Sequence, residues 1–383
     1  MTAILPGATV GILGGGQLGR MTAMAARSLG YHLAALDPDP SCAARFVVEH
    51  CITAGFDDVA AARELARLCQ VATVEIEKIS VDALRAVQEL VPMRPGPEVL
   101  FVVQDRARQK DWLAGHGYPV GPYRKAADEA ELREAVRALG GRAYVKSTHG
   151  GYDGRGQAVV RAEAEVAGAW RALGPSPVVV ERALALRKEL SVLVARRPSG
   201  EARTFPPALN HHEHGILEWS VLPGPFPAEL SARAEEITRS IASALGVEGL
   251  LVAEFFWTEE GELLVNELAP RPHNTFHTTE VACATSQFEQ VTRAVCDLSL
   301  GSTEVLRPGA IVNLLGDLWL RPEPPHFDAA LAIPGVTVHL YGKRVARPGR
   351  KMGHLSAIAA TPEEALQKVQ EARRRLGRET AGG

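Results

Sequence analysis

A glycine-rich run behind a lysine is the feature that most constrains this sequence. Residues 150–157 read GGYDGRGQ and follow Lys146, with β-branched or aromatic segments on both sides. The run therefore predicts a hairpin in which glycines connect two strands. A Walker A loop is excluded, because that motif ends in Gly-Lys-Ser/Thr and begins a helix. Such a hairpin can fold over a triphosphate, since glycines let backbone N–H groups approach phosphate oxygens.

Length and composition indicate a soluble enzyme of two or three domains. The chain has 383 residues, 46% of them hydrophobic, and a formal net charge of −3. This charge argues against a nucleic-acid-coating protein, so an anionic ligand has to meet local basic clusters. The five cysteines show no C-x-x-C pair or zinc spacing, which predicts reduced thiols and a cytoplasmic location. Neither a secretory leader nor a membrane segment is expected.

The order of predicted elements indicates an α/β layer followed by an α+β region. In the first hundred residues, strands at 9–13, 32–36 and 71–76 alternate with helices to about 30, at 58–69 and at 81–90. A proline-rich break precedes a helix at about 102–115. Further on we expect helices at 127–139, 163–173, 232–245 and from 361, and strands at 178–180, 190–196, 250–257, 262–268, 311–315, 336–340 and 354–357.

A second glycine signature, G-x-G-x-x-G, occupies Gly14, Gly16 and Gly19 between a predicted strand and helix. Asp37 ends the next strand, as in a dinucleotide fingerprint, where the helix N-terminus favours a phosphate. A tight strand-to-helix turn without a ligand uses the same residues. The signature leaves both interpretations open.

Two carboxylates predict a metal site. Glu254 and Glu267 lie in strands that a turn at Gly261 would pair, and Asn266 precedes the second glutamate. Carboxylate and amide oxygens on adjacent strands suit Mg²⁺. Both strands are otherwise core-like, and uncompensated buried charge is unfavourable, so incidental surface carboxylates explain the pattern less well.

Three polar side chains follow on a proline turn, namely Arg271, His273 and Asn274. A cation, an imidazole and an amide close together suit a small anion. Because the turn leaves the candidate metal strand, we favour this function over an incidental surface loop.

A histidine-rich stretch at 210–214 superficially suggests zinc. We expect it to form a proline-flanked loop, whereas catalytic zinc usually draws its ligands from a helix or from several elements. Zinc is therefore not expected at this stretch.

Three cations surround a Pro-Gly turn near the C-terminus: Lys343, Arg350 and Lys351. A solvated basic turn is one interpretation. A phosphomonoester site is the other, because several cations around one turn can bind such a group.

Together these motifs resemble the ATP-grasp ligases, and among them the 5-(carboxyamino)imidazole ribonucleotide synthase family of purine biosynthesis. Four segments carry the resemblance: GILGGGQLGRM at 11–21, GGYDGRGQ at 150–157, NELAPRPHN at 266–274 and GRKMGHL at 349–355. The implied fold is α/β and α+β: a Rossmann-like pre-ATP-grasp domain at 1–104, an ATP-grasp domain at 105–298 with a lid at about 123–181, and a small β-rich domain at 299–383.

The resemblance implies an ATP- and Mg²⁺-dependent ligase that converts bicarbonate to carboxyphosphate and transfers the carboxyl group to the amine of aminoimidazole ribonucleotide. Glu254 and Glu267 would hold Mg²⁺. Glu181 and Leu184 would lie on an edge strand beside adenine, and Glu189 would accept the ribose hydroxyls. The implied nucleotide contacts are Arg106, Lys146, Gly151, Tyr152, Asp153, Gly154, Arg155, Gly156, Gln157, Glu181, Arg182, Ala183, Leu184, Glu189, His212, Asn266 and Glu267.

The resemblance also implies which residues act on the other substrates. Tyr152 and Asp153 would close the lid, and the cations of Arg155, Arg271, His273 and Lys351 would neutralise the anionic intermediate. By similarity to the related formate-using ligase, the ribonucleotide would be held by Gln17, Leu18, Glu75, Asn274, Lys343, Arg350 and Lys351. A homodimer acting on small molecules is implied, without nucleic acid or membrane as a partner.

Two departures and three rival functions stay open. Thr275-Phe276 replaces the Ser-Gly common before the histidine at His277, and Thr148-His149 before the loop glycines has no interpretation. The first rival is the formate-using glycinamide ribonucleotide transformylase, which the Tyr152-Asp153 lid disfavours. A nicotinamide-dependent dehydrogenase would leave the distal carboxylates unexplained. The near-complete set of catalytic residue types disfavours a nucleotide-binding regulator without catalysis.

Overall fold

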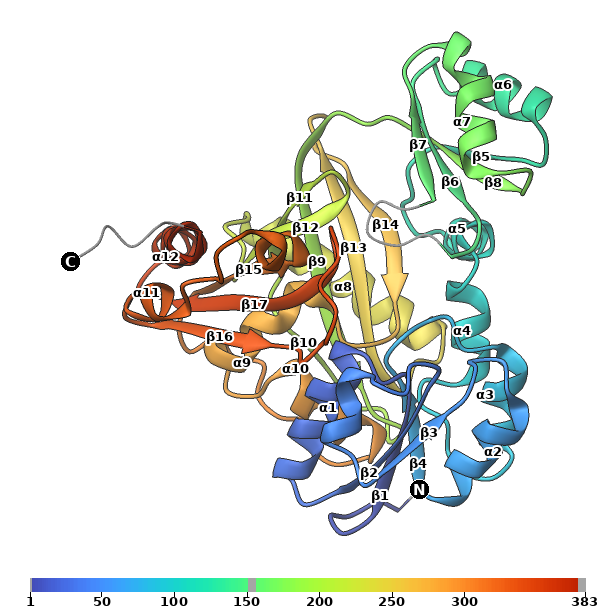
Figure 1. Cartoon of the computed structure of the whole chain (residues 1–383). Helices are drawn as coiled ribbons and strands as arrows, with labels where there is room; N and C mark the ends of the chain where they lie inside the picture. Colours follow the sequence, from blue (N-terminus) through green and yellow to red (C-terminus); the bar gives the residue numbers. More distant parts are fainter. Residues whose placement is uncertain (1, 151–155, 378–383) are drawn as a thin grey trace.

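A parallel sheet in the order β3-β2-β1-β4 forms the N-terminal part of the chain (Figure 1). The computed structural model describes residues 2–150 and 156–377. The strands are β1 (Thr9–Leu13), β2 (His32–Asp37), β3 (His50–Thr53) and β4 (Val71–Val74), and the helices are α1 (Gln17–Ser28), α2 (Val59–Arg67) and α3 (Val81–Gln88). The predicted α/β layer is confirmed. The four-residue strand β3 was missed, because it is too short to show a period.

Two helices stand where the sequence predicted one at 102–115. α4 covers Pro97–Val103 and α5 covers Arg106–Gly115. Asp105 separates them, because its carboxylate accepts a hydrogen bond from Arg108 N and caps the N-terminus of α5. The break places Arg106 in the first turn of the second helix.

A small antiparallel sheet and two helices form a separate lobe, at the upper right of Figure 1. The sheet order is β5-β8-β6-β7. Its strands are β5 (Tyr123–Ala126), β6 (Ala143–Ser147), β7 (Gln157–Val160) and β8 (Val178–Arg182), and helices α6 (Glu129–Ala138) and α7 (Val166–Leu173) pack on it. The predicted hairpin is confirmed, since β6 and β7 pair antiparallel with Lys146 opposite Gln157.

A nine-stranded sheet, mainly antiparallel, runs through the rest of the molecule in the order β14-β13-β9-β11-β12-β15-β17-β16, with β10 beside β9. The strands are β9 (Leu186–Arg196), β10 (Ala202–Thr204), β11 (Ala208–Glu213), β12 (Ile216–Leu222), β13 (Gly249–Thr258), β14 (Leu263–Ala269), β15 (Gly309–Leu315), β16 (Val336–Leu340) and β17 (Lys351–Ile358). Helices α8 (Ala228–Ala244), α9 (Thr279–Ala282), α10 (Gln287–Val295), α11 (Phe327–Leu331) and α12 (Pro362–Leu376) accompany it. The C-terminal strands therefore continue the central sheet, with β15 hydrogen-bonded to β12.

The proline-flanked loop expected at 210–214 is wrong. These residues belong to β11 and to its turn into β12, where His214 and Gly215 have positive φ angles of 51° and 77°. Two consecutive positive φ angles match the twist of a tight hairpin, which explains the pairing.

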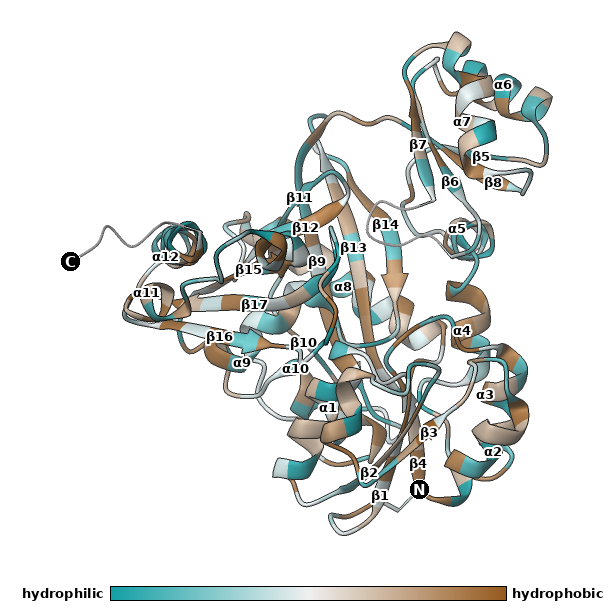
Figure 2. Cartoon of the chain, viewed as in Figure 1, coloured by the Kyte–Doolittle hydropathy of each residue, from teal (hydrophilic) through white to brown (hydrophobic). Residues whose placement is uncertain are grey.

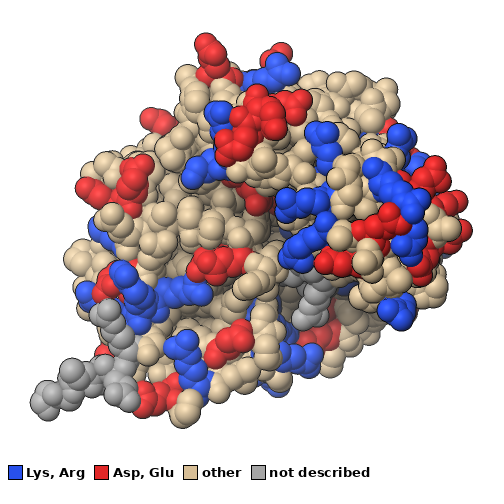
Figure 3. All heavy atoms as spheres, turned by 90° about the horizontal axis from the view of Figure 1, so that it is seen from above, with Lys and Arg blue, Asp and Glu red and all other residues tan. Residues whose placement is uncertain are grey.

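Hydrophobic side chains gather along the strands, whereas helices α6 and α12 carry many hydrophilic ones (Figure 2). Separate buried clusters lie on the N-terminal sheet, in the lobe and beneath α12. Charges of both signs cover the face seen from above, and basic side chains gather beside a hollow near its middle (Figure 3). Among the described residues, no helix is long and apolar enough to cross a membrane.

Candidate active site

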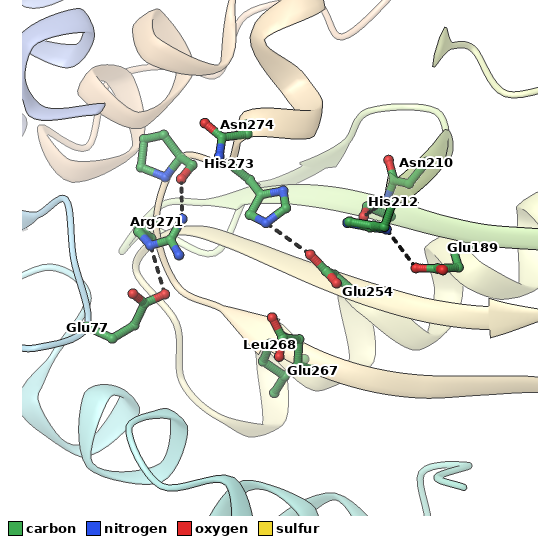
Figure 4. Close-up of polar contacts among 12 residues, drawn as sticks. Glu77, Glu189, Asn210, His212, Glu254, Glu267, Leu268, Arg271, His273 and Asn274 are labelled. Atoms are coloured by element: carbon green, nitrogen blue, oxygen red, sulfur yellow. Dashed lines mark hydrogen bonds and ion pairs between the residues drawn. The ribbon is translucent and has the colours of Figure 1, made fainter. Parts of the chain in front are cut away.

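Glu254 and Glu267 face each other across β13 and β14, as the sequence predicted. The strand register shifts directly after Glu254, and both side chains project into the same space (Figure 4). Asn266 Oδ1 is buried in this region without a hydrogen-bond partner among the residues the structure describes. Two carboxylates and an unpartnered amide oxygen match the all-oxygen set that Mg²⁺ prefers, so these residues fit that ion.

Each carboxylate of this pair already has one nitrogen partner on a neighbouring side chain. Arg106 Nη1 lies 3.0 Å from Glu267 Oε2, and His273 Nε2 lies 3.0 Å from Glu254 Oε1. Burial acts to raise the pKa of Glu254, but the hydrogen bond and electrostatic attraction of His273, together with His212 and Arg271, outweigh burial and lower the pKa to about 2. Glu254 is therefore an ionised carboxylate at neutral pH.

The turn after β14 is held from two sides. Arg271 Nε lies 2.8 Å from Glu77 Oε1. Gln287 accepts a hydrogen bond from His273 N and donates one to His273 O, both at 2.8 Å. The turn thus keeps a guanidinium and an imidazole beside the acidic pair (Figure 4). Neither Glu77 nor Gln287 was predicted as a site residue.

Two lysines share one buried carboxylate between the lobe and the central sheet. Glu181 Oε2 lies 2.8 Å from Lys146 Nζ, and Glu181 Oε1 lies 3.3 Å from Lys110 Nζ. Burial favours a raised pKa for Glu181, but Lys146 and then Lys110 hold it at about 2. Lys110 also donates to Asn266 O at 3.2 Å. Lys110, which was not predicted as a site residue, links the lobe to the strand of the acidic pair.

The expectation that Glu181 lies on an edge strand is wrong, and Leu184 lies beyond the end of that strand, β8. β8 is an interior strand between β5 and β6, so its backbone groups are already paired with two neighbours. Arg182 follows Glu181 on this strand and therefore faces the opposite side, where it lines a cavity of about 450 Å³ together with Arg142. Ala183 N donates to Arg142 O, and Leu184 is half-buried in the segment that leads into β9. The side chain of Arg182 is therefore on the face away from Glu181.

Glu189 and His212 form an ion pair on neighbouring strands. The distance from Glu189 Oε2 to His212 Nδ1 is 2.8 Å. Burial acts to lower the pKa of His212, Glu189 raises it above its ordinary value, and Lys351 opposes the rise from nearby. The preceding histidine, His211, instead stacks on Trp219. The histidine-rich stretch is thus divided between two faces of β11.

The residues expected to bind the ribonucleotide converge from distant parts of the chain. Lys343 Nζ lies 2.5 Å from Gln17 Oε1 and 2.7 Å from Lys351 O. Gln17 Nε2 donates to Asn274 Oδ1 at 3.1 Å. Arg350 Nη1 instead donates to Val345 O at 2.7 Å, within its own turn. α1, the turn after β14 and the start of β17 therefore meet at one place.

Leu18 and Glu75 are placed differently from the rest of this set. The Leu18 side chain is buried in an apolar cluster with Met21, Phe288 and Tyr341, so it cannot reach a polar ligand. Glu75 is buried and accepts hydrogen bonds from Gly16 N and Gly19 N, both at 2.7 Å. Its carboxylate thus holds the glycine loop.

The same contacts distinguish between the two interpretations of the glycine signature at Gly14, Gly16 and Gly19. Gly15 N donates to Asp37 Oδ2 at 2.7 Å, so carboxylates of the chain itself occupy three amides of the loop. A Cβ atom at Gly16 would lie 2.4 Å from Glu75 Oε1, which explains why glycine is required there. A dinucleotide phosphate would compete with these carboxylates, and the tight-turn interpretation is favoured.

The glycine-rich hairpin is described only at its ends. Gly151, Tyr152, Asp153, Gly154 and Arg155 lie outside the described residues. Gly156 O accepts a hydrogen bond from Ser147 N at 2.8 Å, and Gln157 begins β7. The two strands therefore start their pairing directly at the candidate lysine, Lys146.

Three protein families match consecutive parts of the chain. The ribonucleotide synthetase preATP-grasp domain matches residues 7–104, the ATP-grasp domain matches 111–288, and the phosphoribosylaminoimidazole carboxylase C-terminal domain matches 309–368. The N5-carboxyaminoimidazole ribonucleotide synthase of Bacillus subtilis is 41% identical over 369 residues, which cover 96% of this chain and 95% of that protein.

Solved structures agree with these matches. The ADP complex of an N5-carboxyaminoimidazole ribonucleotide synthetase superposes with a TM-score of 0.91 at 40% identity, over 97% of this chain and 98% of that one. An Aspergillus clavatus N5-carboxyaminoimidazole synthase in complex with ADP and 5-aminoimidazole ribonucleotide gives a TM-score of 0.89 at 31% identity, over 97% and 99%. The matches favour the carboxylating enzymes over the formate-using ligase. The chain belongs to the N5-carboxyaminoimidazole ribonucleotide synthase family of ATP-grasp ligases.

Proposed function

We propose that the protein uses ATP to carboxylate 5-aminoimidazole ribonucleotide with bicarbonate, giving the N5-carboxyamino product, ADP and phosphate. One observation carries the assignment of both half-reactions to one cavity. His273 contacts Glu254 of the acidic pair, and its neighbour Asn274 accepts a hydrogen bond from Gln17 beside Lys343. Adjacent residues therefore join the proposed ATP and ribonucleotide sites, so an intermediate need not leave the protein.

The cationic groups near the acidic pair suit the triphosphate. Lys146, Lys110 and Arg106 supply three positive charges against the carboxylates of Glu181 and Glu267. The one positive charge left after this pairing favours the binding of a polyanion. Glu254, Glu267 and Asn266 would hold Mg²⁺, which supplies charge neutralisation at the phosphates when it is bound. The His212–Glu189 pair lies on the next two strands of the sheet, β9 and β11, and fits the ribose side of the nucleotide.

In the first step, a bicarbonate oxygen attacks the γ-phosphorus and ADP leaves, which gives carboxyphosphate. In the second, the exocyclic amine attacks the carboxyl carbon, phosphate leaves with the electrons of the C–O bond, and the amine releases a proton. Arg271 and His273, fixed by Glu77 and Glu254, stabilise the anionic intermediate. Lys351 adds a buried cation at the start of β17.

Other parts of the proposal rest on the sequence resemblance. Tyr152, Asp153 and Arg155, outside the described residues, close the lid over the intermediate. Arg350 and Lys343 hold the ribonucleotide phosphate, and the protein acts as a cytoplasmic homodimer.

ADP release measured with each substrate alone and with both together tests the function. We expect Mg²⁺-dependent release that aminoimidazole ribonucleotide and bicarbonate stimulate strongly in combination. Formate with glycinamide ribonucleotide should have no effect. The assignment would be overturned if formate with glycinamide ribonucleotide stimulated ADP release while bicarbonate with aminoimidazole ribonucleotide did not.

A further inference from the structure

A second group of metal-ligating side chains contains none of the residues proposed to bind ATP or the ribonucleotide. Glu280 on α9, His339 on β16 and His354 on β17 each offer one ligand atom, and these atoms lie within 4.8 Å of one another. Glu280 Oε2 is 3.7 Å from His339 Nδ1 and 3.9 Å from His354 Nε2. The geometry points to a binding site for a transition-metal dication such as Zn²⁺, with two imidazoles and one carboxylate as ligands.

The backbone sets this arrangement before any metal binds. His339 and His354 are direct partners in the antiparallel pairing of β16 with β17, so their side chains leave the same face of the sheet. Their rings stack with an interplanar angle of 13°. The exposed fraction of the side chain is 3% for His354, 22% for His339 and 30% for Glu280. The site is therefore open to solvent beside Glu280 and His339 and closed beside His354.

The distances suit a small dication after a slight closure. Zinc binds imidazole nitrogen and carboxylate oxygen at about 2.0–2.1 Å, which places tetrahedral ligand atoms roughly 3.3–3.4 Å apart. The two measured separations, 3.7 and 3.9 Å, exceed this range by about half an ångström. Because the two imidazole rings are nearly parallel, binding requires rotation of the Glu280 side chain and of the histidine rings towards one point. Two imidazole nitrogens and one carboxylate oxygen form a ligand set that suits both Zn²⁺ and Co²⁺, whereas Mg²⁺ prefers oxygen ligands alone.

A hydrogen bond orients one of the imidazoles. The buried Tyr341 hydroxyl lies 2.9 Å from His354 Nδ1. When His354 Nδ1–H donates to this oxygen, the Nε2 lone pair is directed at Glu280. Metal-bound histidines usually have such a partner on the second nitrogen. Tyr341 therefore corresponds to the group that fixes the tautomer of a metal ligand.

A comparable group, His211 with Glu213 and Glu218, is less suitable. Arg373 Nη1 already lies 2.5 Å from Glu218 Oε1, so that carboxylate has a strong cationic partner. His211 stacks on Trp219, on an exposed part of the hairpin. This group provides a matched control.

Co²⁺ titration of chelator-treated protein, followed by visible absorption in excess Mg²⁺, tests the site. Mg²⁺ is included to occupy the oxygen-rich acidic pair. We expect one Co²⁺ per chain, displaced by Zn²⁺, and loss of this saturable signal in His339→Gln and in Glu280→Gln. Tyr341→Phe should weaken binding about 10- to 100-fold.

Three controls separate this site from others. His211→Gln and Glu267→Gln should keep the signal, and Zn²⁺ should raise the unfolding midpoint of the wild type but not of His339→Gln. If His339→Gln does not fold, Co²⁺ binding by Glu280→Gln, a substitution at a more exposed position, tests the site instead. The site is rejected if the wild type binds no Co²⁺ in excess Mg²⁺, if Glu280→Gln binds as tightly as the wild type, or if Glu267→Gln or His211→Gln removes the signal.

Discussion

Lys343 Nζ lies 2.5 Å from Gln17 Oε1, although 326 residues separate the two in sequence. Gln17 begins α1, and Lys343 follows β16. The contact therefore joins the N-terminal layer to the C-terminal strands at the proposed ribonucleotide site. A ligand bound there would contact both ends of the chain at once.

Replacing Lys343 by alanine should weaken the ribonucleotide and spare ATP. A charge-assisted hydrogen bond contributes about 1.5–3 kcal/mol, which corresponds to roughly a 10- to 100-fold rise in the Michaelis constant for the ribonucleotide where that constant follows binding. Arg347→Ala, which removes an exposed cation from the same turn, is the control and should change neither constant. Steady-state kinetics with each substrate varied would reveal an equal rise for ATP, which contradicts a phosphate contact.

Glu267→Gln should remove Mg²⁺-dependent turnover while the protein stays folded. The substitution keeps the side-chain volume and deletes one proposed ligand charge opposite Glu254. Glu262→Gln, an exposed position just before β14, should behave as the wild type. ADP release across a Mg²⁺ titration measures the effect, and an active Glu267→Gln with unchanged Mg²⁺ dependence would exclude Glu267 as a ligand.

Stability at acid pH should depend on Glu181. Its pKa in the folded protein is about 2, below the ordinary value of 4.5, because burial is outweighed by Lys146 and Lys110. A lowered carboxyl pKa stabilises the fold above pH 4.5, and this stabilisation is lost as the pH falls towards 2. Its full size is on the order of 3 kcal/mol.

Denaturant unfolding of the wild type and Glu181→Gln between pH 6 and pH 3 measures this dependence. The variant should be less stable at pH 6, and the difference should narrow as the pH falls. Glu134→Gln, at an exposed position on α6, is the control and should follow the wild type. A difference that stays constant with pH would mean that the Glu181 charge does not stabilise the fold.

Glu75→Gln should mainly affect stability. The Glu75 carboxylate accepts from Gly16 N and Gly19 N, and a glutamine would direct an N–H₂ group at one of these donors. Leaving a buried N–H donor without its acceptor costs about 1–3 kcal/mol. Glu64→Gln, an exposed position on α2, should stay within about 0.5 kcal/mol of the wild type. A fully stable Glu75→Gln that binds the ribonucleotide more weakly would instead support Glu75 as a substrate ligand.

The acidic pair could be predicted from sequence because its geometry is local. A short turn near Gly261 fixes which residues of β13 and β14 face each other. The hairpin of β11 and β12 could not be predicted in the same way. Its strand carries consecutive polar side chains, and its turn depends on a positive φ at His214, which side chains other than glycine rarely adopt.

Lys110 was missed for a different physical reason. It lies on α5, four residues after Arg106, and a lysine on a helix is usually solvated. Its burial comes from Glu181 on β8 and from Asn266 O on β14, which are distant in sequence. Only tertiary contacts make this lysine part of a site.

The pairing of β12 with β15 has a consequence for the protein during synthesis. Four residues of β12, Trp219 to Leu222, pair with Gly309–Val312, which the ribosome adds about ninety residues later. Until then the backbone N–H and C=O groups on that side of β12 lack their partner strand. The exposed edge of β12 in one incomplete chain can then form these hydrogen bonds with β12 of another incomplete chain. A chain shortened before residue 309 should therefore be prone to aggregation, even though it would contain every carboxylate proposed to bind Mg²⁺.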